Sequence, residues 1–323
     1  MNNEILMQVE NLKTYFPIKR GIFANTVGYI KAVDDVSFTL KKGETIGLVG
    51  ESGCGKTTLG RSIIGLEKVK EGNIIFKDTD LVNANKKQRK ELCKSIQLIF
   101  QDPFSSLNPR LTVFDIITEG LLEHNMIEES PEEDAIHLLE EVGLNKEALY
   151  RYPHEFSGGQ RQRLSIARAI SLKPDLIICD ESVSALDVSV QAQVLNLLMD
   201  LRDKFKMSYL FISHDLSVIR QISHKIAVMY LGKIVEFGDT TSIIENPQHP
   251  YTQALISAVP VPGKPHQNRI IMKGEVPSAA KPPPGCRFHT RCPFATSVCS
   301  IEEPPLTLNG HTEVACFHPI VKK

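Results

Sequence analysis

The run Gly50-Glu51-Ser52-Gly53-Cys54-Gly55-Lys56-Thr57 decides the fold of this 323-residue chain. It fits the pattern G-x-x-x-x-G-K-[ST], in which glycines let successive backbone N–H groups converge on phosphate oxygens. That pattern needs a strand before it and a helix after it, and here the apolar run 45–49 precedes it and a helix-compatible stretch follows. We predict a phosphate-binding loop, in which Lys56 reaches the β- and γ-phosphates and Thr57 offers its hydroxyl to Mg²⁺.

A second apolar run, 176–179, ends in the acids Asp180 and Glu181. Asp180 fits a carboxylate that holds Mg²⁺ through its water shell, because a hard cation prefers oxygen ligands. Successive strand residues face opposite sides, so Glu181 can point elsewhere and position an attacking water. Such a pair is commonly a solvated turn when it stands alone, and the phosphate loop upstream is what favours the catalytic interpretation.

The pattern of apolar runs predicts an α/β domain. From Leu6 to about Gly238, short β-branched runs alternate with helical patterns, which favours a largely parallel sheet. Between about 102 and 168 the strand signals fade and an i, i+3, i+4, i+7 apolar pattern predicts a helical insertion. We also expect a helix at 194–201, a strand at 209–212 and a hairpin at 226–237.

Composition and charge exclude several functions. The 37 basic and 38 acidic residues nearly balance, and the run Lys86 to Lys90 is typical of a solvated helix face, so we expect no nucleic-acid partner. No apolar run approaches the roughly 18 residues that span a bilayer. The start, Met1-Asn2-Asn3-Glu4, has neither a basic region nor a long apolar one, so we expect no secretory signal and a cytosolic protein.

The C-terminal part is rich in proline and cysteine. Its prolines make a compact core unlikely to form unaided; they are Pro260, Pro262, Pro265, Pro277, Pro282, Pro283 and Pro284. In a reducing compartment its cysteines indicate metal before disulfides; they are Cys286, Cys292, Cys299 and Cys316. Their spacing is not that of a zinc ribbon, and from the spacing alone zinc and an iron–sulfur cluster remain equally open.

The run Phe156-Ser157-Gly158-Gly159-Gln160-Arg161-Gln162-Arg163 resembles the signature of ABC-type ATPases, which other P-loop enzymes lack. A Ser-Gly-Gly at a helix start leaves backbone N–H groups able to grip a γ-phosphate. The resemblance implies a P-loop NTPase fold of the ABC type, with a mostly parallel sheet, helices and an antiparallel β part. It also implies that two such domains enclose two ATP molecules, each signature completing the other domain's site.

Further family elements match single positions. Gln101 resembles the Q-loop glutamine, Ser184-Ala185-Leu186-Asp187 the D-loop, and His214 the switch histidine; Glu181, His214 and Gln101 are then the catalytic residues. Phe16 is the expected adenine-stacking aromatic, with Tyr15 as the alternative. The implied ATP site consists of Phe16, Gly50, Ser52, Gly53, Cys54, Gly55, Lys56, Thr57, Thr58, Gln101 and Asp180, and in trans of Ser157, Gly158, Gly159, Gln160 and Asp187. The implied Mg²⁺ ligands are Thr57, Gln101 and Asp180.

Three longer runs, 101–110, 185–193 and 249–252, resemble dipeptide and oligopeptide importers. The resemblance implies an ATP-hydrolysing subunit of the second of the two types that these importers pair. Ser182 departs from the small residue or proline expected there. The implied partners are a homologous ATPase in a heterodimer, two transmembrane permease subunits and an extracytoplasmic substrate-binding protein. The implied location is the cytoplasmic face of the cell membrane.

The same resemblance implies the layout and leaves alternatives for the substrate. Residues 1–240 would form the nucleotide-binding domain, with a helical subdomain at about 102–168. Residues 241–323 would form an extension whose four cysteines hold a [4Fe-4S] cluster, with Zn²⁺ as the alternative.

Related importers also handle nickel and some oligosaccharides. A soluble ABC ATPase acting on DNA or ribosomes is the rival interpretation, but such proteins usually carry a coiled-coil insertion or a second cassette, and neither is visible.

Overall fold

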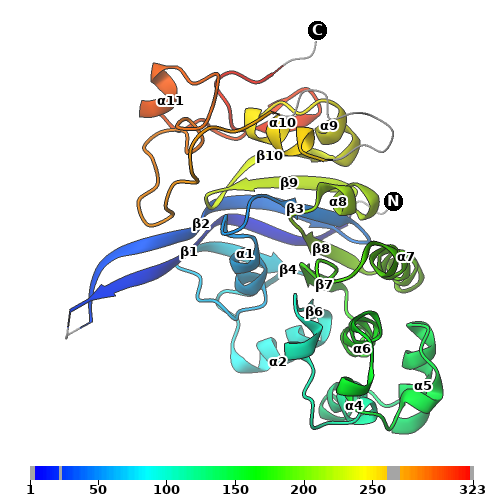
Figure 1. The fold of residues 1–323 in the computed structure, drawn as a ribbon. Helices are drawn as coiled ribbons and strands as arrows, with labels where there is room; N and C mark the ends of the chain where they lie inside the picture. The colour runs from blue at the N-terminus through cyan, green and yellow to red at the C-terminus, as the bar shows by residue number, and fades with distance from the viewer. Residues whose placement is uncertain (1–3, 22–23, 260–269, 321–323) are drawn as a thin grey trace. The chain divides into compact units, whose positions relative to one another are not determined.

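The computed structural model describes residues 4–21, 24–259 and 270–320 (Figure 1). Its contacts divide the chain into two compact units. We call Asn83–Ile212, with Lys41–Glu44, the acidic-pair unit, since it contains Asp180 and Glu181. The phosphate-loop unit consists of Ile5–Leu40, Thr45–Val82 and the chain from Ser213 onward. Three prolines of the proline-rich segment, at 260, 262 and 265, lie outside the described residues.

The acidic-pair unit contains a run of parallel strands in the order β8-β7-β6. They are β6 (Ile96–Ile99), β7 (Leu176–Asp180) and β8 (Ser208–Ile212). Every residue of β7 and β8 is buried, as expected for parallel strands covered on both faces. The register places Ile99 beside Cys179 and Asp180 beside Ile212, so the carboxyl ends of the strands meet at one edge.

Helices account for most of the rest of this unit, and the predicted helical insertion is confirmed. They are α2 (Lys86–Ser95), α3 (Pro103–Ser106), α4 (Val113–Glu123), α5 (Pro131–Glu141), α6 (Gly158–Ile170) and α7 (Val188–Phe205), with 3-10 turns at Lys146–Ala148 and Pro153–Glu155. The Thr112 and Ser130 side chains cap α4 and α5 at their N-termini. In Figure 1, α4, α5 and α6 lie together, and each contacts the other two.

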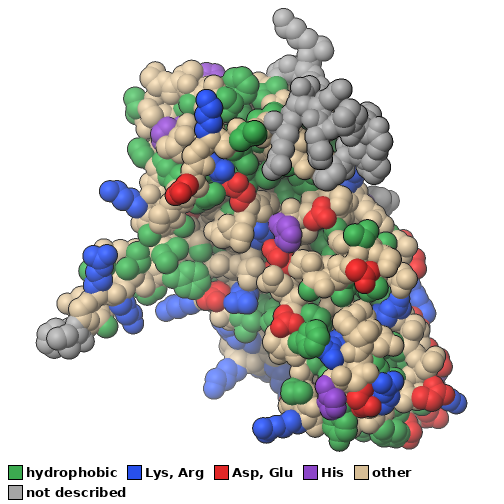
Figure 2. All heavy atoms as spheres, in the orientation of Figure 1, with side chains coloured by type: hydrophobic (Ala, Val, Ile, Leu, Met, Phe, Trp, Pro, Cys, Tyr) green, Lys and Arg blue, Asp and Glu red, His purple; other side chains and the backbone are tan. Residues whose placement is uncertain are grey.

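The phosphate-loop unit begins with an antiparallel sheet in the order β2-β1-β4-β5. Its strands are β1 (Ile5–Arg20), β2 (Asn25–Lys41), β4 (Glu71–Phe76) and β5 (Thr79–Asp80). β1 pairs with β4 and shifts register between Glu10 and Lys13. The blue hairpin β1–β2 is long in Figure 1, and Figure 2 shows Lys and Arg side chains along it. The sequence pattern predicted an α/β chain here but not these two long strands.

A second group of strands in this unit has the order β11-β12-β10-β9-β3. They are β3 (Thr45–Val49), β9 (Lys225–Tyr230), β10 (Lys233–Asp239), β11 (Thr307–Asn309) and β12 (Thr312–Val314). β3 and β9 are parallel, and the predicted hairpin is β9–β10. The C-terminal extension adds β12 beside β10, with Phe237 facing Glu313, so the tail continues an existing sheet instead of forming a separate core.

The remaining helices of the phosphate-loop unit are short. They are α1 (Lys56–Ile63), α8 (Leu216–Ile222), α9 (Thr240–Glu245), α10 (Pro250–Ser257) and α11 (Ser297–Ile301). In the described part of the chain, no helix combines the length and the apolar character needed to cross a membrane.

Candidate functional site

The predicted phosphate loop has the expected strand–turn–helix setting. β3 is buried along its whole length, and α1 begins directly after the last glycine of the motif. Gly55 has a φ of 110°, and a Cβ there would lie 2.0 Å from the Ala32 carbonyl oxygen, so only glycine fits. Gly55 is also the N-cap of α1 and supplies no side-chain hydrogen bond. The loop and the first turn of α1 therefore leave backbone N–H groups without a side-chain cap, an arrangement that can bind an anion.

Lys56 extends its ammonium group across this loop. Its side chain is buried, and Nζ donates to the Gly50 carbonyl at 2.8 Å and to the Glu51 carbonyl at 3.2 Å. Thr57 and Thr58 follow in the first turn and are partly exposed. The structure thus brings a cation, two hydroxyl groups and the helix N-terminus to one place, which is the donor set that a polyphosphate requires.

Glu51 is held by three groups, two of which the sequence did not indicate. Its backbone N–H lies 2.8 Å from the Tyr251 hydroxyl, and its carboxylate accepts from Arg291 Nη1 at 2.7 Å and Nη2 at 3.1 Å. The third group is Lys56, which donates to its carbonyl. Arg291 immediately precedes Cys292, so the only signal in the sequence was an arginine inside the cysteine-rich tail.

The acidic pair lies at the end of β7. Asp180 is the last strand residue and is 4% exposed. Glu181 has a φ of 48°, a left-handed conformation that is uncommon outside glycine and is found repeatedly at functional sites. Its N–H donates to the Ile212 carbonyl at 3.0 Å, and Gln101 Nε2 donates to its Oε2 at 3.1 Å. Gln101 and Glu181 are therefore neighbours, as the β6–β7 register requires.

The Ser157 turn and the Asp187 turn also lie close together in the acidic-pair unit. Ser157 caps α6 and Asp187 caps α7, and both residues are exposed. A Cβ on Gly159 would lie 2.4 Å from Val190 Cγ1, so a glycine is needed where the two turns meet. The Val190 N–H, 2.9 Å from Asp187 Oδ1, lowers the pKa of that carboxyl. The two turns form one exposed surface that is rich in backbone donors.

His214 and the aromatic pair belong to the phosphate-loop unit. His214 is exposed and lies between β8 and α8. Tyr15 and Phe16 are adjacent in β1, so their side chains face opposite sides. The Tyr15 hydroxyl donates to Asp34, and Lys70 Nζ lies 4.5 Å from the Tyr15 ring centroid. Burial and the hydrogen bond to Asp34 raise the pKa of Tyr15.

The predicted site residues are thus divided between the two units. The phosphate-loop unit holds Phe16, His214 and the loop at 50–58, whereas the acidic-pair unit holds the Gln101–Glu181 neighbours, Asp180 and the paired Ser157 and Asp187 turns.

The four tail cysteines line one cavity of about 10 Å³, together with Phe288 and Phe294. Each is a free thiol. Burial raises the pKa of Cys316 to about 11, and the three neighbouring thiols act in the same direction. Among the residues that the structure describes, no group of three or more Cys, His, Asp or Glu side chains is arranged to hold a metal ion. The cysteines converge as the sequence predicted, without forming a closed ligand shell.

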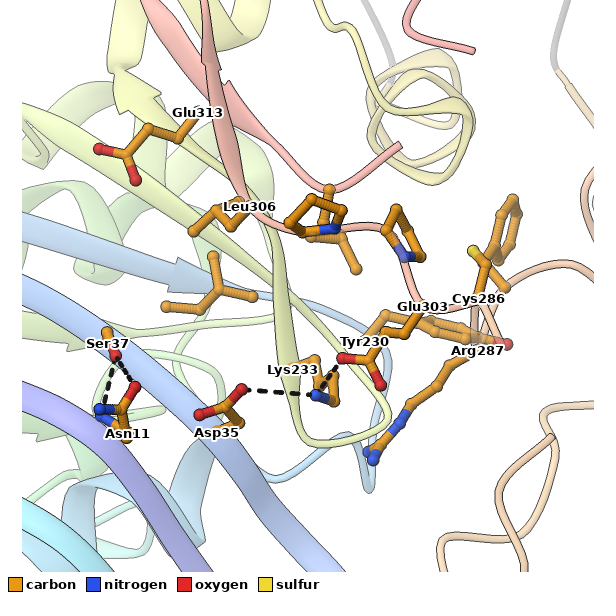
Figure 3. Close-up of a pocket in the computed structure, with 16 residues that line it drawn as sticks. Asn11, Asp35, Ser37, Tyr230, Lys233, Cys286, Arg287, Glu303, Leu306 and Glu313 are labelled. Atoms are coloured by element: carbon orange, nitrogen blue, oxygen red, sulfur yellow. Dashed lines mark hydrogen bonds and ion pairs between the residues drawn. The ribbon is translucent and has the colours of Figure 1, made fainter. Parts of the chain in front are cut away.

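A larger cavity, about 330 Å³, lies between the extension and strands β1, β2 and β10 (Figure 3). Lys233 from β10 donates to Glu303 of the extension and lies 3.9 Å from Asp35 of β2. Arg287, which also lines this cavity, donates to Asp34 and to the Leu231 carbonyl. These polar contacts join the extension to the strands that precede and follow the phosphate loop.

Comparison with known proteins gives a consistent result. Residues 33–184 match the ABC transporter family, and residues 235–299 match the oligopeptide/dipeptide transporter C-terminal region. The oligopeptide transport ATP-binding protein AppF of Bacillus subtilis is 54% identical over 94% of each chain. The dipeptide transport ATP-binding protein DppF of Escherichia coli is 48% identical over 97% of this chain and 94% of its own.

Solved structures agree on the fold. The ATP-binding cassette MJ0796, in a post-hydrolysis state with ADP and Pi, aligns with 73% of this chain and 99% of its own at a TM-score of 0.64 and 24% identity. The sequence relatives, the two matched regions and this fold lead to one assignment. The chain belongs to the ABC transporter family, among the ATP-binding proteins of oligopeptide and dipeptide transporters.

Proposed function

We propose that this chain binds and hydrolyses ATP to power the import of di- and oligopeptides through an ABC transporter. The observation that carries the proposal is the loop between β3 and α1, where Lys56 and uncapped backbone N–H groups form an anion site. The peptide class is supported by relatives named as oligopeptide and dipeptide transport ATP-binding proteins, which match nearly the whole chain.

The loop residues would hold the phosphates of ATP, and the backbone amides at 50–58 would orient the triphosphate. Thr57, Asp180 and Gln101 are the proposed ligands of Mg²⁺, since their hydroxyl, carboxylate and amide oxygens suit a hard cation. When bound, Mg²⁺ would neutralise charge on the phosphate oxygens. Phe16 is the proposed adenine partner, because the neighbouring Tyr15 already contacts Asp34 and Lys70.

Glu181 is the proposed general base. Its carboxylate is held by Gln101 at the end of a buried strand, which fixes its direction, and a carboxylate in that position can accept the proton of an attacking water. Gln101 would orient Glu181 and the attacking water. His214 would lie beside the γ-phosphate, where its imidazole can donate a hydrogen bond.

A second, homologous ATPase subunit is the proposed partner across the nucleotide. The Ser157 and Asp187 turns are exposed and adjacent, and they offer the N–H groups that a γ-phosphate bound to another subunit would need. Ser157, Gly158, Gly159, Gln160 and Asp187 would therefore act in trans.

Two transmembrane permease subunits and an extracytoplasmic binding protein complete the proposed transporter, which places this chain at the cytoplasmic face of the membrane. Large apolar side chains are exposed on the acidic-pair unit, which supports a protein contact there; they are Phe104, Leu122, Tyr150 and Tyr152. Phe104 follows Gln101 by three residues, so a contact there could reach the proposed catalytic pair.

Deletion of this chain should abolish uptake of labelled di- and oligopeptides, because the permease would lose its source of free energy. Wild-type chain supplied in trans should restore uptake, and Lys56→Ala should not. Uptake of nickel and of labelled oligosaccharides is measured in the same strains as the control. If uptake of nickel or of oligosaccharides were lost while peptide uptake stayed intact, the peptide assignment would be wrong. The proposed role as the ATP-driven motor would remain.

The cysteine cavity is the proposed site of a [4Fe-4S] cluster, with Zn²⁺ as the alternative. Four thiols line one cavity and are the donors that either group takes, although they would have to draw closer to bind it; a bound group would supply cross-links to a tail with little core of its own. Anaerobically purified protein should show a visible thiolate-to-iron absorption band, which Cys299→Ser should remove. Cys93→Ser, at an exposed thiol outside the tail, is the control. Colourless protein with stoichiometric zinc would overturn the iron assignment.

A further inference from the structure

The C-terminal extension contacts the phosphate loop through a partly buried ion pair. Both terminal nitrogens of Arg291 donate to the two carboxylate oxygens of Glu51, at 2.7 and 3.1 Å. The Arg291 side chain is 7% exposed and the Glu51 side chain is 24% exposed, so solvent and salt reach the carboxylate in part. A two-pronged arginine–carboxylate contact fixes both position and orientation. The extension therefore determines where this loop carboxylate lies.

The position of that carboxylate matters because Glu51 is the residue directly after Gly50 in the phosphate loop. An unpaired negative charge there would repel a bound triphosphate, and the repulsion would be strong in a partly buried site. Arg291 cancels the charge of the carboxylate. The same residue, Glu51, also accepts from Lys56 through its carbonyl, so a shift of Glu51 would disturb the cation proposed to reach the phosphates.

Arg291 is itself held by packed aromatic side chains. Its guanidinium carbon lies 5.9 Å from the Tyr230 ring centroid, and Tyr230 packs against Tyr251 at 4.7 Å and Phe288 at 5.3 Å. All three rings are buried. Tyr251 also contacts the Glu51 N–H through its hydroxyl. One rigid cluster thus holds Glu51 at its backbone and at its carboxylate.

A second arginine of the extension makes a similar contact near the aromatic pair of β1. Arg287 donates to Asp34, and Asp34 accepts from the Tyr15 hydroxyl. Arg287 and Arg291 each flank a tail cysteine, at 286 and 292. Two cationic side chains from one short segment thus pair with Glu51 of the phosphate loop and with Asp34, which contacts the neighbour of Phe16.

We propose that Arg291 is a positioning residue for nucleotide binding, which neutralises and fixes the Glu51 carboxylate so that the phosphate loop can accept a triphosphate. The C-terminal extension then takes part in nucleotide binding through Arg291. This inference rests on the proposed binding of ATP by the loop around Lys56.

The test measures the Kd for ATP of the full-length chain by calorimetry, at low and high salt. Arg291→Gln should weaken ATP binding about tenfold at low salt, because the Glu51 charge is left uncompensated. The loss should shrink at high salt, where charges that solvent can reach are screened. The double variant E51Q/R291Q should recover most of the affinity, since it lacks the anion. Lys281→Gln, which removes the same charge from an exposed position in the extension, is the matched control and should bind as wild type.

The outcomes separate this inference from the proposed function. Wild-type affinity in Arg291→Gln, with binding lost in Lys56→Ala, would overturn the inference and leave the phosphate loop assignment intact. Failure of the wild-type chain to bind ATP would instead overturn the proposed function. If E51Q/R291Q binds as weakly as Arg291→Gln and the loss is insensitive to salt, Arg291 acts only through packing and the inference is wrong. The thermal unfolding midpoint of each variant shows whether it remains folded.

Discussion

Lys56→Ala is expected to eliminate ATP turnover, with kcat/KM falling by about 10³-fold or more. The Lys56 ammonium group is the positive charge of the loop, and it donates to the carbonyls of Gly50 and Glu51. Alanine keeps the helix and removes that charge, so the triphosphate would be held by N–H groups alone. Phosphate release and ATP affinity are both measured on the purified chain.

Lys87→Ala, at an exposed position of α2, is the control for a loss of charge elsewhere. Because Lys56 is buried, the thermal unfolding midpoint of the variant must be compared with that of wild type. Turnover within about tenfold of wild type in a folded Lys56→Ala chain would show that the phosphates bind elsewhere.

Glu181→Gln is expected to lower kcat by about 10²–10⁴-fold while leaving ATP affinity nearly unchanged. The amide has the same shape and can keep a hydrogen bond with Gln101, but it cannot accept a proton from water. With hydrolysis blocked, ATP should remain bound, and the chain should accumulate as a dimer with its partner ATPase. Single-turnover kinetics and size-exclusion chromatography with ATP measure the two effects.

The matched control is Glu140→Gln, an exposed carboxylate on α5 in the same unit. It should hydrolyse ATP as wild type and form no additional dimer. Normal hydrolysis in Glu181→Gln would remove the general-base assignment, whereas loss of ATP binding would indicate that Glu181 holds the nucleotide or its metal instead.

Several elements were predictable because their signals are local. β3 and β7 read as continuous apolar runs, since all of their residues are buried. The β9–β10 hairpin follows from the Leu231-Gly232 turn, where both residues have positive φ. The phosphate loop combines a fixed spacing with a strand and a helix on either side. For the same reason Glu181, just beyond a buried strand, could be placed as a candidate before its contact with Gln101 was seen, whereas Gln101 was a candidate only through its resemblance to the Q-loop glutamine.

Other features depend on pairings that the sequence does not mark. β1 and β2 are long, and β2 exposes the apolar residues Val27, Tyr29 and Ile30, so apolar residues do not mark the buried face over part of their length. β1 also pairs with β4, which lies beyond the phosphate loop in the chain. The Glu51–Arg291 ion pair joins residues 240 positions apart. Neither contact has a periodic signal, because each exists only after the chain has folded.

The most direct test is a structure of the Glu181→Gln chain with its partner ATPase, Mg²⁺ and ATP. The predicted result is a triphosphate held by the backbone amides around Lys56, with the Ser157 turn of the opposing subunit against the γ-phosphate. A nucleotide bound away from this loop, or a closed dimer whose Ser157 turn faces solvent, would contradict the proposed motor.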